Sequence, residues 1–206
     1  MSNHFRSSIA VSCVCTAIFI ATPLVRSLEA QSDRSGGVPM LTDLRNVDDL
    51  KTLFDKDVGK FRLVLLLSPT CPVCIVGGRW VQTKILARYP GANLRVYAIW
   101  FNMFPGDARS KWRPDVLTDP RVIHRWDEGK VVGRWYGERT SSLRPKLTAE
   151  SNWNGEILWD SYLLYGPEAH WDDVPTGVIH WERTIVAAGE TLRIDAERLL
   201  KPNLGR

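Results

Sequence analysis

Two cysteines, Cys71 and Cys74, are the residues of this sequence whose type and spacing point most directly to chemistry. They enclose Pro72 and Val73, and one turn of helix over this spacing brings the two sulfurs within bonding distance. At the start of a helix, unpaired N–H groups and the helix dipole stabilise a thiolate. Cys71 can then attack a disulfide, and Cys74 can resolve the mixed disulfide that forms. The motif predicts thiol–disulfide exchange with these two residues as the catalytic pair.

Two other interpretations of the pair stay open. Two thiolates at this spacing also suit soft cations such as Cu(I), Hg(II) or Zn, so a metal-binding or metal-transfer protein is an alternative. A non-catalytic binding module is the other. The histidines beyond the amino-terminal segment, His124, His170 and His180, show no ligand spacing. We expect no metal among the site residues and no cofactor.

The segments on both sides of the pair predict a strand before it and a helix after it. Residues 62–68 are a continuous apolar run of strand length, as in a strand buried on both faces of a sheet. We expect a helix over 71–89, with Pro72 in its first turn and a bend or a close backbone contact at 77–78. A second buried strand over 94–101 completes a β–α–β unit.

The remaining chain predicts further elements from less regular patterns. No internal repeat occurs. In chain order the expected elements are a helix over 48–56, a short helix over 107–116 capped by 105–107, a strand over 121–126, a helix over 127–136, a polar loop over 141–154, a strand within 156–165, an antiparallel hairpin of 177–181 with 184–188, and a helix over 194–200.

The sequence resembles the thioredoxin-like superfamily, which includes thioredoxins, bacterial Dsb proteins and periplasmic TlpA-type proteins. Residues 63–67 with the dithiol after them carry the resemblance, together with 174–179, which is similar to the family's cis-proline loop. It implies an α/β, three-layer fold with a central mixed sheet flanked by helices. The stretch after the second core strand is longer than a minimal thioredoxin needs, so we expect an insertion between that strand and the cis-proline strand. The resemblance also implies that Pro175 is cis and lies beside Cys71. The substrate-binding residues expected on this basis are Pro72, Val73, Val174, Pro175 and Thr176.

The sequence also departs from the family's pattern. The aromatic residue that usually precedes the first cysteine is replaced by Ser68-Pro69-Thr70. The strand over 62–68 has no carboxylate that could accept the proton of Cys74, only Arg62 near its start. These departures bear on turnover as a general reductase, and they leave the fold prediction unchanged.

The amino terminus predicts export. Arg6 precedes an apolar stretch over 9–25, and Ala30 is followed by a polar run, as in a secretory signal peptide. An uncleaved anchor is the alternative, because the apolar stretch approaches the ~20 residues that span a bilayer. The expected organisation is a signal peptide or anchor over 1–30, a linker over 31–39 and a thioredoxin-like domain over 40–206, with an insertion over about 102–155. The predicted location is secreted or periplasmic.

The charge of the chain argues against nucleic acid as a partner. The formal net charge is +4, and the positive residues are spread along the chain. No nucleotide-binding loop or nucleic-acid-binding motif occurs. The expected partners are protein thiols or disulfides, or a redox partner protein. Contact with a membrane is expected only through the amino-terminal segment, if it is uncleaved.

Overall fold

The computed structural model describes residues 38–143 and 155–200. They belong to one compact unit of the chain, Ser35–Arg206. The predicted export segment, most of the predicted linker and most of the loop expected over 141–154 lie outside the described residues. None of the helices in the two described ranges has the length and hydropathy that a membrane span requires.

Six strands form one mixed sheet in the middle of the molecule. They are β1 (Leu41–Asp43), β2 (Phe61–Leu67), β3 (Leu94–Trp100), β4 (Val122–Trp126), β5 (Ser161–Tyr165) and β6 (Val178–Arg183). Their order across the sheet is β1-β4-β3-β2-β5-β6. The strands from β1 to β2 run parallel, and β5 and β6 are antiparallel to their neighbours. This confirms the predicted mixed sheet, and β2 is one of its two central strands.

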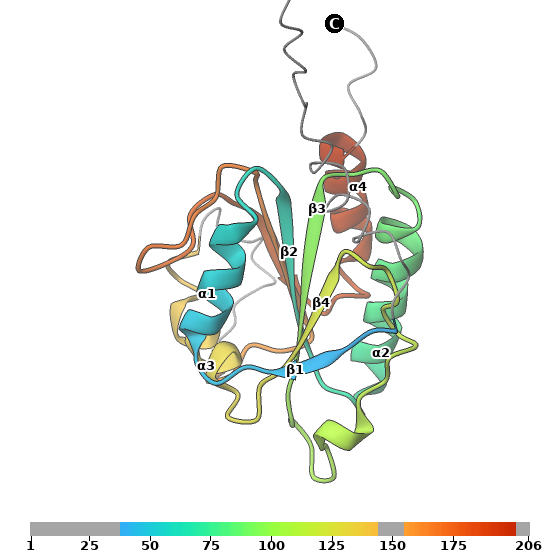
Figure 1. Ribbon diagram of the computed structural model, residues 1–206, viewed down its shortest axis with the longest axis vertical. Coiled ribbons are helices and arrows are strands. Elements are labelled where there is room, and N and C mark those ends of the chain that lie inside the picture. Colours follow the sequence, from blue (N-terminus) through green and yellow to red (C-terminus); the bar gives the residue numbers. More distant parts are fainter. Residues whose placement is uncertain (1–37, 144–154, 201–206) are drawn as a thin grey trace, which may run out of the picture. The chain divides into compact units, whose positions relative to one another are not determined.

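Helices cover both faces of the sheet (Figure 1). On one face lie α1 (Val47–Lys56) and α3 (Val131–Arg139), and on the other lie α2 (Pro72–Val81) and α4 (Gly189–Leu200). The π-helical turn η3 (Gln82–Leu86) continues α2, so the helix predicted over 71–89 is present in two parts. The three layers, and the dithiol between β2 and α2, are those of the predicted thioredoxin-like fold.

The apolar run of β2 fills the core on both sides of the sheet. Side chains alternate along a strand, so Leu63 and Leu65 pack with α2 and α4, whereas Val64 and Leu66 pack with α1 and α3. All four are buried. Burial of each such side chain stabilises the fold by about 1.5–3 kcal/mol. A strand with two buried faces therefore leads directly into the dithiol.

Close packing occurs at the two glycines of α2. A Cβ atom on Gly77 would lie 2.9 Å from Cβ of Ile185, and one on Gly78 would lie 2.6 Å from Cγ1 of Val116. Both distances are shorter than side chains tolerate. The predicted close contact at 77–78 is confirmed. The helix stays regular there, and its irregularity comes at η3 instead.

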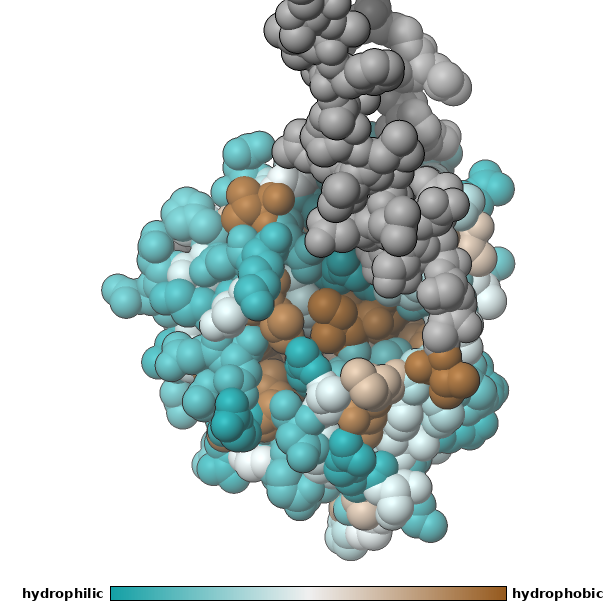
Figure 2. Space-filling view, viewed as in Figure 1, coloured by the Kyte–Doolittle hydropathy of each residue, from teal (hydrophilic) through white to brown (hydrophobic). Residues whose placement is uncertain are grey.

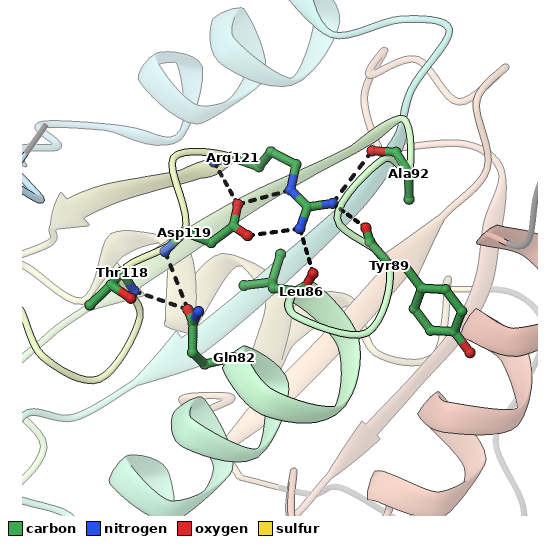
Figure 3. A network of polar contacts seen from close by, with 7 residues as sticks. All are labelled: Gln82, Leu86, Tyr89, Ala92, Thr118, Asp119 and Arg121. Atoms are coloured by element: carbon green, nitrogen blue, oxygen red, sulfur yellow. Dashed lines mark hydrogen bonds and ion pairs between the residues drawn. The ribbon is translucent and has the colours of Figure 1, made fainter. Parts of the chain in front are cut away.

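Arg121, in the loop before β4, holds the end of this helix (Figure 3). Its guanidinium donates to the carbonyl oxygens of Leu86 and Tyr89, each at 2.7 Å, and pairs with the carboxylate of Asp119 at 2.7 Å. The Oε1 atom of Gln82 accepts from the backbone N–H of Asp119 at 3.3 Å. Carbonyls at a helix end have no partner within the helix, so these bonds satisfy them and tie η3 to β4.

The helix predicted over 107–116 is wrong in extent. Only the short 3-10 turn η4 (Arg109–Lys111) forms, and no side chain caps it. The carboxylate of Asp107 is engaged elsewhere, because it accepts from the backbone N–H groups of Met103 and Phe104. Pro114 also lacks the N–H that a longer helix would use.

The hairpin predicted for 177–181 with 184–188 is also wrong. β6 pairs with β5, and residues 184–188 form a turn that leads into α4. Ile185 in this turn is buried, and Gly77 of α2 leaves the space for it. Packing on α2 therefore outweighs the local tendency of this segment to extend, and α4 begins at Gly189, before the predicted start at 194.

The segment predicted as an insertion over about 102–155 contributes two elements to the body of the fold. β4 lies inside the sheet between β1 and β3, and α3 packs beside α1. β1 pairs only with the last three residues of β4, so Val122 and Ile123 stay half-buried at the sheet edge. In Figure 2, hydrophobic residues gather over this part of the molecule, between the two helix layers, on a face that is otherwise mostly hydrophilic.

Candidate active site

The dithiol lies where β2 ends and α2 begins. Cys71 is the N-cap of α2, Pro72 is its first helical residue, and the Sγ atom of Cys71 accepts from the backbone N–H of Cys74 at 3.4 Å. The two cysteines are not bonded to each other. Pro72 costs no hydrogen bond at this position, since the first N–H groups of a helix have no partner within it. A negative charge on the Cys71 sulfur would thus be stabilised by an oriented N–H and by the helix dipole.

Both thiols are buried. Cys71 exposes 2% of its surface and Cys74 none. Burial raises the pKa of the Cys74 thiol well above its ordinary value, and the hydrogen bond with Cys71 and the negative charge of Asp160 act in the same direction. Cys74 therefore keeps its proton in the dithiol form, which suits its predicted role as the resolving cysteine. A substrate reaches the Cys71 sulfur only if the residues that cover it move.

Asp107 holds the Ser-Pro-Thr loop that precedes the dithiol. Its carboxylate accepts from the Ser68 hydroxyl at 2.7 Å, from the Thr70 backbone N–H at 3.2 Å and from the Thr70 hydroxyl. The backbone N–H groups of Met103 and Phe104 add bonds of 2.8 and 2.9 Å. Burial acts to raise the pKa of Asp107, but these hydrogen bonds outweigh it and hold the pKa below its ordinary value. The sequence predicts only a helix-capping role for Asp107.

A buried carboxyl group, Asp160, lies at the same end of the sheet as the dithiol. It directly precedes Ser161, which pairs with Leu66 near the end of β2. Asp160 exposes 2% of its surface and has a φ of +49°. Burial raises its pKa, against the opposing effects of the Thr184 hydroxyl and the Ile185 backbone N–H. The sequence offered no signal for this position beyond an aspartate just before a strand.

The prediction that the loop at 174–176 faces the dithiol is wrong. Val178, which follows this loop, pairs with Tyr165, and Tyr165 pairs with Arg62 at the start of β2. The dithiol follows the other end of β2, about 17 Å away at ~3.3 Å per residue. Val174, Pro175 and Thr176 therefore lie at the opposite end of the sheet from Cys71.

The peptide bond before Pro175 is not cis either. Among the described residues, the cis peptide bond joins Arg183 and Thr184. Pro175 instead forms an isolated antiparallel bridge with Trp171. The strand that runs antiparallel to β2 is β5, and the described residues directly before it, 155–160, include Trp159 and Asp160 and no proline.

Apolar side chains are exposed on α2 next to the dithiol and on the loop that Asp107 joins to Thr70. Val73 and Val76 of α2 are 46% and 54% exposed, and Phe104 is 42% exposed. The ring of Phe104 meets that of Trp159 edge-on, with the centroids 5.4 Å apart. Of the predicted substrate-binding residues, Pro72 and Val73 thus lie at the site. We refer to Val73, Val76, Phe104 and Trp159 as the apolar rim.

The histidines take part in separate structural contacts. His124 is buried, accepts from Trp100 Nε1–H at 3.1 Å, and has its Nε2 atom 3.1 Å from the carbonyl oxygen of Leu117. The ring of His180 contacts the hydroxyl of Tyr162 at 2.7 Å. In the ranges that the structure describes, no group of three or more His, Cys, Asp or Glu side chains is placed to hold a metal ion.

Comparison with known proteins gives structural likeness only. No family model matches the chain, and no curated protein matches it. A secreted disulfide oxidoreductase from Mycobacterium tuberculosis aligns with a TM-score of 0.40 and 13% identity, over 70% of this chain and 85% of that one. The thioredoxin domain of a thiol-disulfide oxidoreductase from Bacteroides vulgatus aligns with a TM-score of 0.34 and 11% identity, over 66% and 81%. The strand order and the place of the dithiol, independently of these alignments, give the chain its thioredoxin-like fold.

Proposed function

We propose that this protein is an exported thiol–disulfide oxidoreductase in which Cys71 is the nucleophile and Cys74 the resolving residue. The observation that carries the proposal is the Cys71 sulfur at the N-cap of α2, where it accepts from the Cys74 backbone N–H at 3.4 Å. This arrangement places an N–H donor and the positive end of the helix dipole at the Cys71 sulfur. The buried, protonated Cys74 supplies the second thiol.

The exchange proceeds in two steps, and each bond that forms is matched by one that breaks. The Cys71 thiolate attacks one sulfur of a substrate disulfide, forms a mixed disulfide and releases the other sulfur as a thiolate. Cys74 then loses its proton and attacks the Cys71 sulfur, which releases the second substrate sulfur. The substrate disulfide gains two electrons and the Cys71–Cys74 pair loses them. The reverse sequence oxidises a substrate dithiol.

Protein thiols or disulfides are the substrate class that the surroundings support. The apolar rim gives an extended polypeptide a hydrophobic contact beside the dithiol, with Val76 and Phe104 about half exposed. Residues 1–30 would deliver the domain outside the cytoplasm, where disulfides persist. Amino-terminal sequencing of the protein recovered from the extracytoplasmic fraction tests this location. Recovery of the chain from the cytosol alone would refute it.

Insulin reduction by a thiol reductant tests the activity. The wild type is expected to accelerate it, and Cys71→Ser is expected to abolish the acceleration. Cys74→Ser is expected to retain the first step and to accumulate a mixed disulfide, which gel electrophoresis without reductant detects. A wild-type rate no greater than that of Cys71→Ser would refute the proposal.

The burial of both thiols favours a second candidate function, a non-catalytic thioredoxin-like binding module. Alkylation of the native, reduced protein by iodoacetamide separates the two. In an oxidoreductase, motions of the folded protein must expose Cys71 to substrate. Iodoacetamide is then expected to label Cys71 without denaturant and to leave Cys74 unlabelled. A binding module is labelled at neither cysteine until the protein is unfolded.

A further inference from the structure

The resolving step requires a group that takes the proton of Cys74. This thiol is fully buried and its pKa is raised, so it does not ionise readily by itself. β2 supplies no acceptor near it, because Arg62 lies at the far end of that strand and is itself a donor. The acceptor must therefore come from another element.

Three aspartates are buried in the described part of the chain, and two of them are engaged. Asp57 pairs with Lys60 at 2.6 Å and with Arg95 at 3.1 Å. Asp127 caps α3, where it accepts from two backbone N–H groups at 2.9 Å each. The third, Asp160, has an Oδ1 atom that is buried and has no hydrogen-bond partner among the described residues. A buried carboxyl oxygen without a partner is costly, and such groups are often kept for function.

The fold brings Asp160 to the dithiol. Because Ser161 pairs with Leu66 of β2, the residue before it reaches the end of the sheet where Cys71 and Cys74 lie. A second contact supports this position. The backbone N–H of Ile185 bonds to Asp160, and the side chain of Ile185 packs on Gly77. Gly77 lies three residues after Cys74 on α2. The negative charge of Asp160 also affects the ionisation of Cys74. The charged group that acts on Asp160 from β6 is Arg183, which favours its ionised form.

We propose that the Asp160 carboxylate accepts the proton of Cys74 when the mixed disulfide is resolved. This inference rests on the proposed function. The proton passes from the Cys74 sulfur to Asp160, directly or through one water. The Cys74 thiolate attacks the Cys71 sulfur, the new S–S bond forms and the substrate sulfur leaves as a thiolate. Asp160 then returns its proton to the departing thiolate or to solvent.

Asp160→Asn removes the proton acceptor and suits the backbone. Asparagine, like aspartate, tolerates the left-handed conformation that the φ of +49° imposes. The Asn carbonyl can still accept from Thr184 and Ile185. Asp127→Asn is the matched control, because it alters a buried carboxyl at the start of α3, on the other face of the sheet. Thermal melting checks that both variants are folded.

The aromatic disulfide DTNB allows the two steps to be measured separately. Attack by Cys71 releases one coloured thiolate, and resolution by Cys74 releases a second. Stopped-flow absorbance therefore records a first and a second phase. For Asp160→Asn near pH 7 we expect an unchanged first phase and a second phase slowed about tenfold or more. The control is expected to leave both phases within about twofold of the wild type.

The pH profile of the second phase identifies the acceptor. While Asp160 is ionised, the wild-type rate is expected to be nearly independent of pH. In Asp160→Asn the rate is expected to rise about tenfold per pH unit, because hydroxide replaces the carboxylate. An equal slowing of both phases, no slowing, or a wild-type second phase that already rises tenfold per unit would overturn the inference. The wild-type profile decides this even if the variant does not fold, and an absent first phase would refute the proposed function itself.

Discussion

Acid is expected to destabilise this protein through His124. Its ring is buried between Trp100 and the loop that contains Leu117, and it accepts a hydrogen bond from Trp100, which requires a neutral ring. Burial lowers the pKa of His124 to about 4, from 6.5. The unfolded chain therefore binds a proton between these two values and the folded chain does not, so stability falls as the pH falls.

The size of the effect follows from the two pKa values. The contribution of His124 is fully present above pH 6.5 and declines as the pH drops toward 4. At about pH 5 the loss in the free energy of unfolding is about 2 kcal/mol, and it approaches about 3 kcal/mol near pH 4. His180, whose pKa is also lowered by burial, adds a change of the same sign. The carboxylates with lowered pKa values lose their contribution only in stronger acid.

Urea unfolding followed by tryptophan fluorescence measures this effect. The wild type, His124→Gln and His180→Gln are compared at near-neutral pH and at about pH 5, with a reductant present. His124→Gln is expected to lose about 2 kcal/mol less than the wild type between the two conditions. The control His180→Gln retains the contribution of His124. If His124→Gln and the wild type show the same change with pH, the reasoning about the buried ring is refuted.

Three further outcomes follow from packing and from the position of the site. Asp107→Ala is expected to lower the free energy of unfolding by about 2 kcal/mol, because the loop before Cys71 loses its hydrogen-bond acceptor. The same variant is expected to speed iodoacetamide labelling of Cys71. Unchanged stability in urea and unchanged labelling would contradict this. Gly78→Ala is expected to cost about 1–3 kcal/mol, since its Cβ would lie 2.6 Å from Val116, and an unchanged melting temperature would speak against the packing. Pro175→Ala is expected to leave both phases of the DTNB reaction unchanged, because Pro175 lies at the far end of the sheet, and a slowed phase would place this loop at the dithiol after all.

Much of the architecture could be predicted from local patterns. The apolar run of β2, the helix that begins after Cys71 and the strand β3 lie within one continuous stretch of the chain, from Phe61 to Trp100. Their hydrophobic spacing, the proline in the first helical turn and the glycine–proline breaks therefore specify them without knowledge of the rest of the chain. The roles proposed for Cys71 and Cys74 follow from the same local geometry.

Strand pairing and register decide which residues lie close to the dithiol, and no local sequence pattern specifies them. A loop with Val-Pro-Thr can precede any antiparallel strand, and here it precedes β6, at the sheet edge. The strand paired with β2 is β5, so Trp159 and Asp160 lie at the dithiol although no motif marks them. Residues distant in the sequence meet according to which strands pair and in which register. The sequence by itself thus determined which two sulfurs we propose to react, and only the tertiary structure decided which carboxyl group lies at the same end of the sheet.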